Sequence, residues 1–431
     1  MLDAIKNFLS KNPLLQVTGF NSLSVFIKLI SSFIVSKLTA VLLGTQGITI
    51  IGNLRNILSI GQNISVLGLQ NAVVKYTGES QSDEDEFNVF ISTLFCILLM
   101  VSSIVFITIY GFSVQLSDYI FNTAEYHFVF KWLAILLPLH ALNVYLNSIL
   151  KGIEQFKKVI QINILTHVLN VLLFSYCIYA YDLAGALMAV IIVPSASFAF
   201  TVVLASKYFN FWSNIKLKHF SKQYLSNFGE YALMTLVSAI SFPLVYLGIR
   251  LYLNDNISLN AAGYWEMNFR VSTFYLVFMQ SLLQLYILPK LVSAKGQSEF
   301  RTIVLTFYKQ VMPLFAIGLL IVFLLREYVI LIVSSDEFLP SASLLGWQIV
   351  ADFFRVLALV MVYQFHAKKM FWRYVITDML LAIGLYFSVI VLVPYFGLKG
   401  VVVGHAIVYV LYFIIILMVF RKVFLPNFFK N

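Results

Sequence analysis

The 431-residue chain has few charged residues, which make up only 11% of its composition. Soluble domains contain about 25% Asp, Glu, Lys and Arg, so this scarcity argues against a soluble enzyme or regulatory domain. Hydrophobic residues make up 61% of the chain. Apolar runs of about 20 residues, the length needed to cross a bilayer, recur along its whole length. The composition therefore predicts an all-α polytopic membrane protein.

Cysteine is also scarce, because Cys96 and Cys177 are the only two and both lie inside apolar runs. A disulfide framework is therefore not expected. The sequence also lacks the His/Cys spacing of a metal site, a GxxxxGK[ST] phosphate loop and a long outer loop with clustered acids or bases. These absences argue against a metalloenzyme, an ATPase and a membrane-bound polymerase or ligase. We expect no enzyme activity, no metal and no cofactor.

The net charge of +10 would suit a nucleic-acid-binding protein, but the positions of the charges indicate otherwise. Lys and Arg cluster in short loops on one side of the apolar runs, and few of them lie on the other side. The positive-inside rule places the Lys- and Arg-rich side in the cytoplasm. Both termini are therefore predicted to be cytoplasmic, and no nucleic acid partner is expected.

Twelve membrane-spanning helices are predicted from the apolar runs. They cover about 17–43, 47–74, 87–110, 128–150, 159–179, 184–205, 231–253, 262–288, 311–333, 344–365, 374–392 and 401–420. The longest polar connection, residues 207–227, divides them into two halves. We predict an N-terminal six-helix bundle over 1–210 and a C-terminal six-helix bundle over 211–431.

The second predicted helix carries a polar stripe. Arg55, Ser59 and Gln62 follow one another at i, i+4 and i+7, so they share one helix face. An Arg near the middle of a membrane costs roughly 2.5–3.5 kcal/mol on insertion scales, and such residues normally face a bundle interior or a watery cavity. The stripe therefore indicates a polar cavity. The alternative is a buried ion pair that only holds helices together.

The same pattern recurs in the second half of the chain. An Asn-x-Arg triplet at 53–55 is followed by Lys75, 22 residues after its Asn. A second triplet at 268–270 is followed by Lys290 at the same spacing. Helix of that length spans about 33 Å, close to one bilayer core. Two copies 215 residues apart predict an internal duplication.

Ionisable residues within predicted spans are the candidates for function. The candidate substrate-binding residues, which would line a cationic cleft, are Lys28, Arg55, Gln62, Arg270 and Arg355. Such a cleft attracts anions, and Arg is suited to bidentate phosphate contacts. Asp352 and Glu266 are candidates for ion coupling. Glu266 and Arg270, at i and i+4, are alternatively suited to pair with each other, and Arg250 is expected to extend toward the membrane interface.

Several short segments together carry a resemblance to a known family. They are LGTQG at 43–47, NLR at 53–55, GLQNAVVKY at 68–76, WQIVADFFR at 347–355 and, more weakly, LKG at 150–152, LP at 288–289 and VSSDEF at 333–338. With these segments the chain resembles the Wzx-type flippases, in the branch of O-antigen translocases and lipid III flippases. The resemblance extends over about residues 17–420 and matches Arg55, Asp352 and Arg355 to motif positions.

This resemblance implies a MATE-like fold of two six-helix bundles around a central cleft. It implies alternating-access transport of an undecaprenyl-diphosphate-linked oligosaccharide from the cytoplasmic to the periplasmic leaflet of the bacterial inner membrane. An O-antigen repeat unit is the first choice of substrate, and the enterobacterial common antigen lipid is the second. The implied partners are membrane lipid, an O-antigen polymerase and a chain-length regulator.

Two other classes of transport protein remain as alternatives. A drug/cation antiporter of the same superfamily should have a cleft dominated by acids, and the excess of Lys and Arg in the spans argues against it. A channel should have charged residues in a ring, and the Lys and Arg here are spread over several helices. The sequence therefore favours a flippase.

Overall fold

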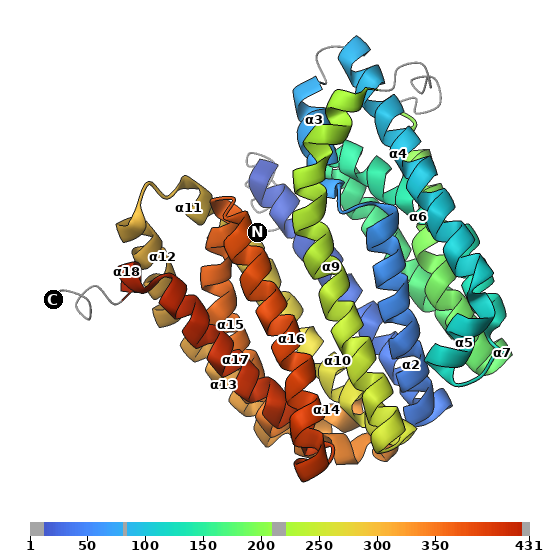
Figure 1. Cartoon of the computed structure of the whole chain (residues 1–431), viewed down its shortest axis with the longest axis vertical. Coiled ribbons are helices and arrows are strands. Elements are labelled where there is room, and N and C mark those ends of the chain that lie inside the picture. The colour runs from blue at the N-terminus through green and yellow to red at the C-terminus, as the bar shows by residue number, and fades with distance from the viewer. Residues whose placement is uncertain (1–12, 81–83, 209–220, 425–431) are drawn as a thin grey trace, which may run out of the picture. The chain divides into compact units, whose positions relative to one another are not determined.

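The computed structural model describes residues 13–80, 84–208 and 221–424, with side chains described in 22–79, 85–208, 221 and 236–424. Every regular element in these ranges is a helix (Figure 1). Ten helices among the described residues are long and apolar enough to cross a membrane. The all-α polytopic fold is confirmed, whereas twelve crossings and cytoplasmic termini stay predictions.

The helices follow one another with short connections along most of the chain. The elements before residue 257 are α2 (Pro13–Ser65), α3 (Gln70–Ser80), α4 (Glu84–Gly111), α5 (Ser113–Phe121), α6 (His127–Gly152), α7 (Phe156–Ala205) and α9 (Lys222–Asn256). The later elements are α10 (Leu259–Leu282), η2 (Leu283–Ile287), α11 (Leu288–Ser293), α12 (Gln297–Gln310), α13 (Met312–Leu324), α14 (Arg326–Val333), η3 (Asp336–Leu344), α15 (Leu345–Ala367), α16 (Phe371–Phe396), α17 (Lys399–Val419) and α18 (Arg421–Phe424).

Contacts group the chain into two compact units. Unit 1 consists of Met1–Leu42 with Asn53–Ile240, and unit 2 consists of Leu43–Gly52 with Ser241–Asn431. A short segment from the middle of α2 therefore belongs to unit 2, and α9 contributes to both units. The predicted boundary between residues 210 and 211 lies outside the described residues and stays a prediction.

The two longest helices, α2 and α7, each contain a backbone break. A helix of 50 residues, the length of α7, would extend about 75 Å, more than twice the bilayer core. Gly44 breaks α2 with φ 60° and ψ −159°, and Asp182 breaks α7 with φ 49° and ψ −132°. Both breaks fall between predicted spans. The α7 helix therefore contains two predicted spans, and α2 contains the first span and most of the second.

The second predicted helix, however, is not continuous to residue 74, and that expectation was wrong. Leu67 and Gly68 have positive φ values of 49° and 62°, so α2 ends at Ser65 and α3 begins at Gln70. The Tyr145 hydroxyl stabilises this break by donating to the Val66 carbonyl at 3.0 Å. In the second copy of the predicted repeat, the π-helix η2 begins at the corresponding position (Gly68 plus 215 is Leu283).

The ninth predicted helix also differs from the structure. Residues 311–333 form two helices, α13 and α14, because Leu325 leaves helical geometry at φ −98° and ψ 16°. The connection between the eighth and ninth predicted helices, residues 289–310, is largely helical, and it contains most of α11 and all of α12. A 3-10 helix, η3, precedes α15.

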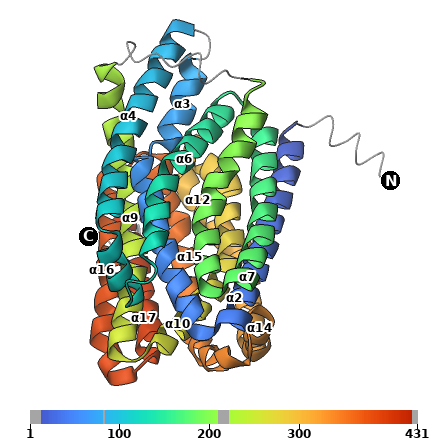
Figure 2. The ribbon, with the colours of Figure 1, turned by 90° about the vertical axis from the view of Figure 1, so that its right-hand side faces the viewer.

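The core of unit 1 lies between α3, α4 and α6. Its buried side chains include Ala72, Val73, Phe90, Leu94, Ala141 and Tyr145. Gly152 allows α3 and α6 to approach closely, since a Cβ there would lie 2.5 Å from the Cβ of Thr77. Elsewhere in unit 1, α7 runs beside the first part of α2 (Figure 2), where Asn170 donates to Ser31 at 3.1 Å.

The core of unit 2 lies between α10, α12 and α15 to α17. Buried members include Leu276, Phe300, Phe307, Phe365, Leu385 and Tyr409. A second apolar cluster gathers around the buried Trp265 of α10. These helices position the polar side chains described below.

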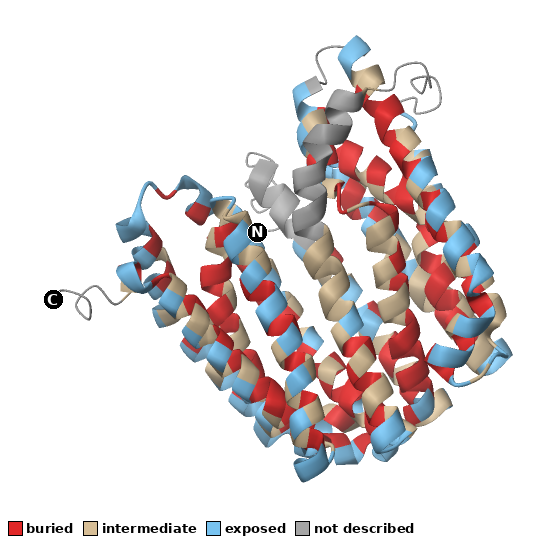
Figure 3. Cartoon of the chain, in the orientation of Figure 1, coloured by how far each residue is buried: buried red, intermediate tan, exposed pale blue. Residues whose placement is uncertain are grey.

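Exposed residues recur along several helices (Figure 3), and many of them are large and apolar. On α4 they are Leu99, Met100, Ile104 and Ile107, and on α16 they are Ile376, Leu380, Ile383, Phe387 and Val391. Apolar patches of this length are rare on soluble monomers. In a bilayer these faces contact acyl chains, which supports the assignment of these helices as membrane-spanning.

Candidate functional site: a buried cationic cluster in unit 2

Three charged side chains are buried together in unit 2. Arg250 on α9 is 1% exposed, Glu266 on α10 is 5% exposed and Arg270, one turn further along α10, is 7% exposed. Charges are rarely buried unless they are paired. We call these three residues the cationic cluster, because two arginines and one glutamate leave a net formal charge of +1.

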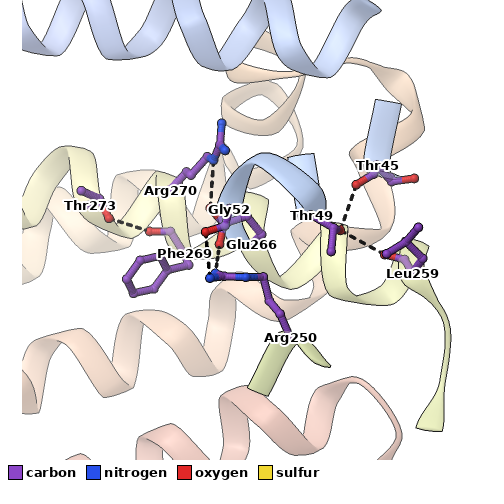
Figure 4. A network of polar contacts seen from close by, with 9 residues as sticks. All are labelled: Thr45, Thr49, Gly52, Arg250, Leu259, Glu266, Phe269, Arg270 and Thr273. Atoms are coloured by element: carbon purple, nitrogen blue, oxygen red, sulfur yellow. Dashed lines mark hydrogen bonds and ion pairs between the residues drawn. The ribbon is translucent and has the colours of Figure 1, made fainter. Parts of the chain in front are cut away.

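Glu266 lies between the two arginines and uses a different oxygen for each (Figure 4). Its Oε2 accepts a hydrogen bond from Nη1 of Arg250 at 2.5 Å. Its Oε1 accepts one from Nε of Arg270 at 3.1 Å. The predicted pairing of Glu266 with Arg270 is therefore confirmed, and a second arginine joins it.

Arg250 is held from three directions. Besides its bond to Glu266, its Nη2 donates to the Gly52 carbonyl at 3.0 Å, and its guanidinium carbon lies 5.9 Å from the centroid of the Trp265 ring. Gly52 also leaves room for the Glu266 carboxylate, since a Cβ there would lie 2.9 Å from Cδ of Glu266. The expectation that Arg250 extends to the interface was wrong, because burial and two hydrogen bonds fix it inside unit 2.

Arg270 is held on one side only. Its Nε bonds to Glu266, whereas Nη1 and Nη2 have no hydrogen-bond partner among the described residues. Leaving buried donors unpaired is costly. A guanidinium fork with open N–H groups matches the geometry of a carboxylate or phosphate. The cluster can therefore bind an oxyanion at the Nη1/Nη2 side of Arg270.

A second polar cluster surrounds Asp352 of α15, which is 0% exposed. Its carboxylate accepts hydrogen bonds from the hydroxyls of Ser272 and Tyr275, each at 2.5 Å. The Gln348 amide donates to it at 3.2 Å from one turn earlier and accepts from Asn268 at 3.3 Å. All of these hydrogen-bond donors are neutral, and the Arg355 guanidinium, one turn further along α15, interacts with the carboxylate electrostatically.

The other predicted residues are distributed over both units. Lys28 is exposed, and Arg55 and Gln62 are half-buried, all on the parts of α2 in unit 1. Arg355 on α15 of unit 2 is half-buried, with its guanidinium carbon 5.6 Å from the Tyr409 ring centroid. Within unit 2 the structure brings Glu266 and Arg270 together. A single cleft lined by all five candidate substrate-binding residues stays a prediction.

The sequence did contain a signal for Arg250. Ser258 is the N-cap of α10 and accepts a hydrogen bond from the Ala261 amide. Arg250 and Glu266 lie eight residues before and after Ser258. In a helical hairpin, residues equally distant from the turn lie side by side. Pairing α9 with α10 about this turn would have placed the two charges in contact.

A third polar group fixes the segment of α2 that belongs to unit 2. The buried Thr45 hydroxyl lies 2.8 Å from Oε1 of Glu337 and 2.9 Å from Oδ1 of Asn260. The Thr45 amide also donates to Glu337 at 3.2 Å. Thr45 and Asn260 are 215 residues apart, which is the separation of the two Asn-x-Arg copies. Two positions that the predicted duplication would equate are therefore in contact.

Long apolar helices with buried charges in unit 2 define the class as a polytopic α-helical membrane protein, and solved structures share this fold. An inward-facing MATE family multidrug transporter of the MOP superfamily has a TM-score of 0.74 at 15% identity, over 93% of this chain and 95% of that one. The lipid II flippase MurJ in an inward closed conformation has a TM-score of 0.71 at 12% identity, over 97% and 94%. The predicted MATE-like fold is confirmed.

The family follows from the sequence match. The model of the family described as "Polysaccharide biosynthesis protein" matches residues 14–295, and the chain belongs to this family. Curated relatives include the lipid III flippases of Escherichia coli (strain K12) and Shigella flexneri. Each is 23% identical over 406 residues, which cover 93% of this chain and 96% of the relative. The resemblance to that flippase branch is confirmed, and these relatives are transporters rather than enzymes.

Proposed function

We propose that the protein translocates an undecaprenyl-diphosphate-linked oligosaccharide from the cytoplasmic to the periplasmic leaflet of the bacterial inner membrane. The membership in the polysaccharide biosynthesis family and the two lipid III flippase relatives support a substrate of this class. The observation that carries the proposal is the buried Arg270 guanidinium, of which two nitrogens have no hydrogen-bond partner among the described residues. An anionic headgroup is the ligand that such a group needs.

In this proposal the diphosphate binds at Arg270. One phosphate accepts hydrogen bonds from Nη1 and Nη2, the bidentate geometry that arginine favours with phosphate. The net +1 charge of the cationic cluster, in a medium of low polarity, strengthens the attraction. The sugars hydrogen-bond to amide and hydroxyl side chains, while the polyprenyl tail stays in the bilayer. Lys28, Arg55, Gln62 and Arg355 add further cationic or polar contacts during translocation.

Alternating access would carry the headgroup across, as in other transporters built from repeats. An inside-negative membrane potential favours outward movement of an anion by about 2.3 kcal/mol per charge and 100 mV. Asp352 is the proposed site for coupling to an ion gradient, because its carboxylate is buried and its hydrogen-bond donors are all neutral. Glu266 is a weaker candidate because two arginines already engage it.

The glycan remains a choice between two. An O-antigen repeat unit is the first candidate. The second candidate is lipid III, the enterobacterial common antigen lipid, and the names of the two curated relatives support it. An O-antigen polymerase and a chain-length regulator are proposed partners for the first candidate only.

Complementation in two bacterial strains tests the function and the glycan together. One strain lacks its O-antigen flippase and the other its lipid III flippase, and each receives the wild type, Arg270→Gln or Arg301→Gln. Arg301 is exposed on α12 and serves as the matched control. Wild type and Arg301→Gln should restore surface polysaccharide in one strain, which identifies the glycan, and Arg270→Gln at normal protein level should not. Restoration in neither strain contradicts the proposal.

A further inference from the structure

We propose that Arg250 is a positioning residue that keeps the Arg270 fork open for the diphosphate. It does so by occupying one oxygen of Glu266. This inference rests on the proposed function and assigns a role to a residue that does not itself touch the substrate.

The hydrogen bonds around Glu266 show how this works. A carboxylate and a guanidinium prefer two parallel hydrogen bonds. Here Glu266 gives only Oε1 to Nε of Arg270, because Oε2 is bound to Nη1 of Arg250. Without Arg250, both oxygens would be available to Arg270. One of its terminal nitrogens would then pair with Glu266 and leave the position where we place the phosphate.

Charge supports the same conclusion. With Arg250 present the cationic cluster has a net charge of +1, and without it Glu266 cancels Arg270 completely. A neutral Glu–Arg pair has little attraction for a diphosphate. The two effects, loss of the open fork and loss of net charge, act in the same direction.

Arg250 is fixed too firmly to bind the substrate directly. It is 1% exposed, its Nη1 bonds to Glu266 and its Nη2 bonds to the Gly52 carbonyl. Arg270, whose Nη1 and Nη2 are open, is the residue left for ligand contact.

This arrangement predicts an unusual result for a pair of substitutions. Arg250→Gln should weaken binding of undecaprenyl diphosphate by at least about tenfold, because Arg270 collapses onto Glu266. Adding Glu266→Gln should restore binding to within about threefold of wild type, because the competing carboxylate is gone and Arg270 keeps its charge. A role of Arg250 in packing alone gives no reason for a second substitution to restore ligand affinity.

The experiment measures binding of radiolabelled undecaprenyl diphosphate to the purified full-length protein in nanodiscs. Undecaprenol, which lacks the diphosphate, is the neutral control ligand, and Arg301→Gln is the control variant. If wild type does not bind the diphosphate more tightly than undecaprenol, the proposed function is overturned. If wild type binds but Arg250→Gln binds equally well, or the double variant binds no better than Arg250→Gln, the positioning role is overturned.

Removing one partner of a buried ion pair can prevent folding, so Arg250→Lys is the second variant. The lysine ammonium would place a single positive charge next to the Glu266 carboxylate. Its affinity should stay within about threefold of wild type, and a tenfold loss in correctly folded protein would overturn the role. The Arg270→Gln variant should lose binding whether or not Arg250 and Glu266 are also changed.

Discussion

A methyl group at residue 52 should disturb the cationic cluster without changing any charge. The Cβ of Gly52→Ala would lie 2.9 Å from Cδ of Glu266 and 3.1 and 3.2 Å from its two oxygens. The carboxylate cannot simply turn away, because Arg250 and Arg270 hold one oxygen each. Either α2 or Glu266 must therefore move by several tenths of an ångström.

The expected cost follows from a comparison with a second glycine. Replacing glycine by alanine inside a helix gains about 1 kcal/mol, whereas overpacking a filled site costs about 1–3 kcal/mol. Gly318 lies in α13, and a Cβ there would have nothing within 4 Å. Both variants gain helix propensity, but only Gly52→Ala has the overpacking cost. The free energy of unfolding of Gly52→Ala should therefore be lower than that of Gly318→Ala by about 1–3 kcal/mol.

Thermal unfolding of the two purified variants in the same detergent measures this difference. The transition of Gly52→Ala should be lower by a few degrees, and its transport in the complementation strain should fall while that of Gly318→Ala stays at wild-type level. Equal stability and equal transport of the two variants would refute the close packing of α2 against Glu266 and the importance of its geometry.

Three further substitutions test other parts of the structure. Asp352→Asn should remove any dependence of transport on an ion gradient at normal protein level, and an unchanged dependence would reject Asp352 as the coupling site. Arg55→Ala should abolish complementation in normally inserted protein if Arg55 contacts the substrate, whereas full activity would leave it a structural role. Tyr145→Phe should lower the free energy of unfolding by about 1 kcal/mol, because the buried Val66 carbonyl loses its donor. A thermal transition equal to wild type would show that this bond does not stabilise the break at Leu67.

The sequence predicts best where one helix carries the whole pattern. The pairing of Glu266 with Arg270 was predicted from their spacing of four residues on one helix. Arg250 was misjudged because its partners come from α10 and α2, and helical periodicity says nothing about contacts between helices. Arg250 and Glu266 are equally far from the α9–α10 turn, and comparing these two distances would have predicted their contact.

Backbone breaks were harder to predict than charges. Gly44 falls in a predicted connection, but the break at Leu67–Gly68 lies inside an apolar run where hydropathy stays high. A positive φ at a leucine depends on its surroundings, here the bond from Tyr145 to Val66. The assignment of residues 43–52 to unit 2 likewise depends on contacts with residues more than 200 positions later.

That last feature sets the order in which the molecule can be completed on the ribosome. Thr45 is synthesised 215 residues before Asn260 and 292 residues before Glu337. At about 5–20 residues per second, Leu43–Gly52 waits roughly 10–60 s for these partners. During that interval its hydroxyls and amides need water or the insertion machinery as temporary partners. The second half of the chain therefore folds against a segment that was synthesised much earlier. An N-terminal fragment produced alone would contain Leu43–Gly52 without the residues that this segment contacts in the full-length protein.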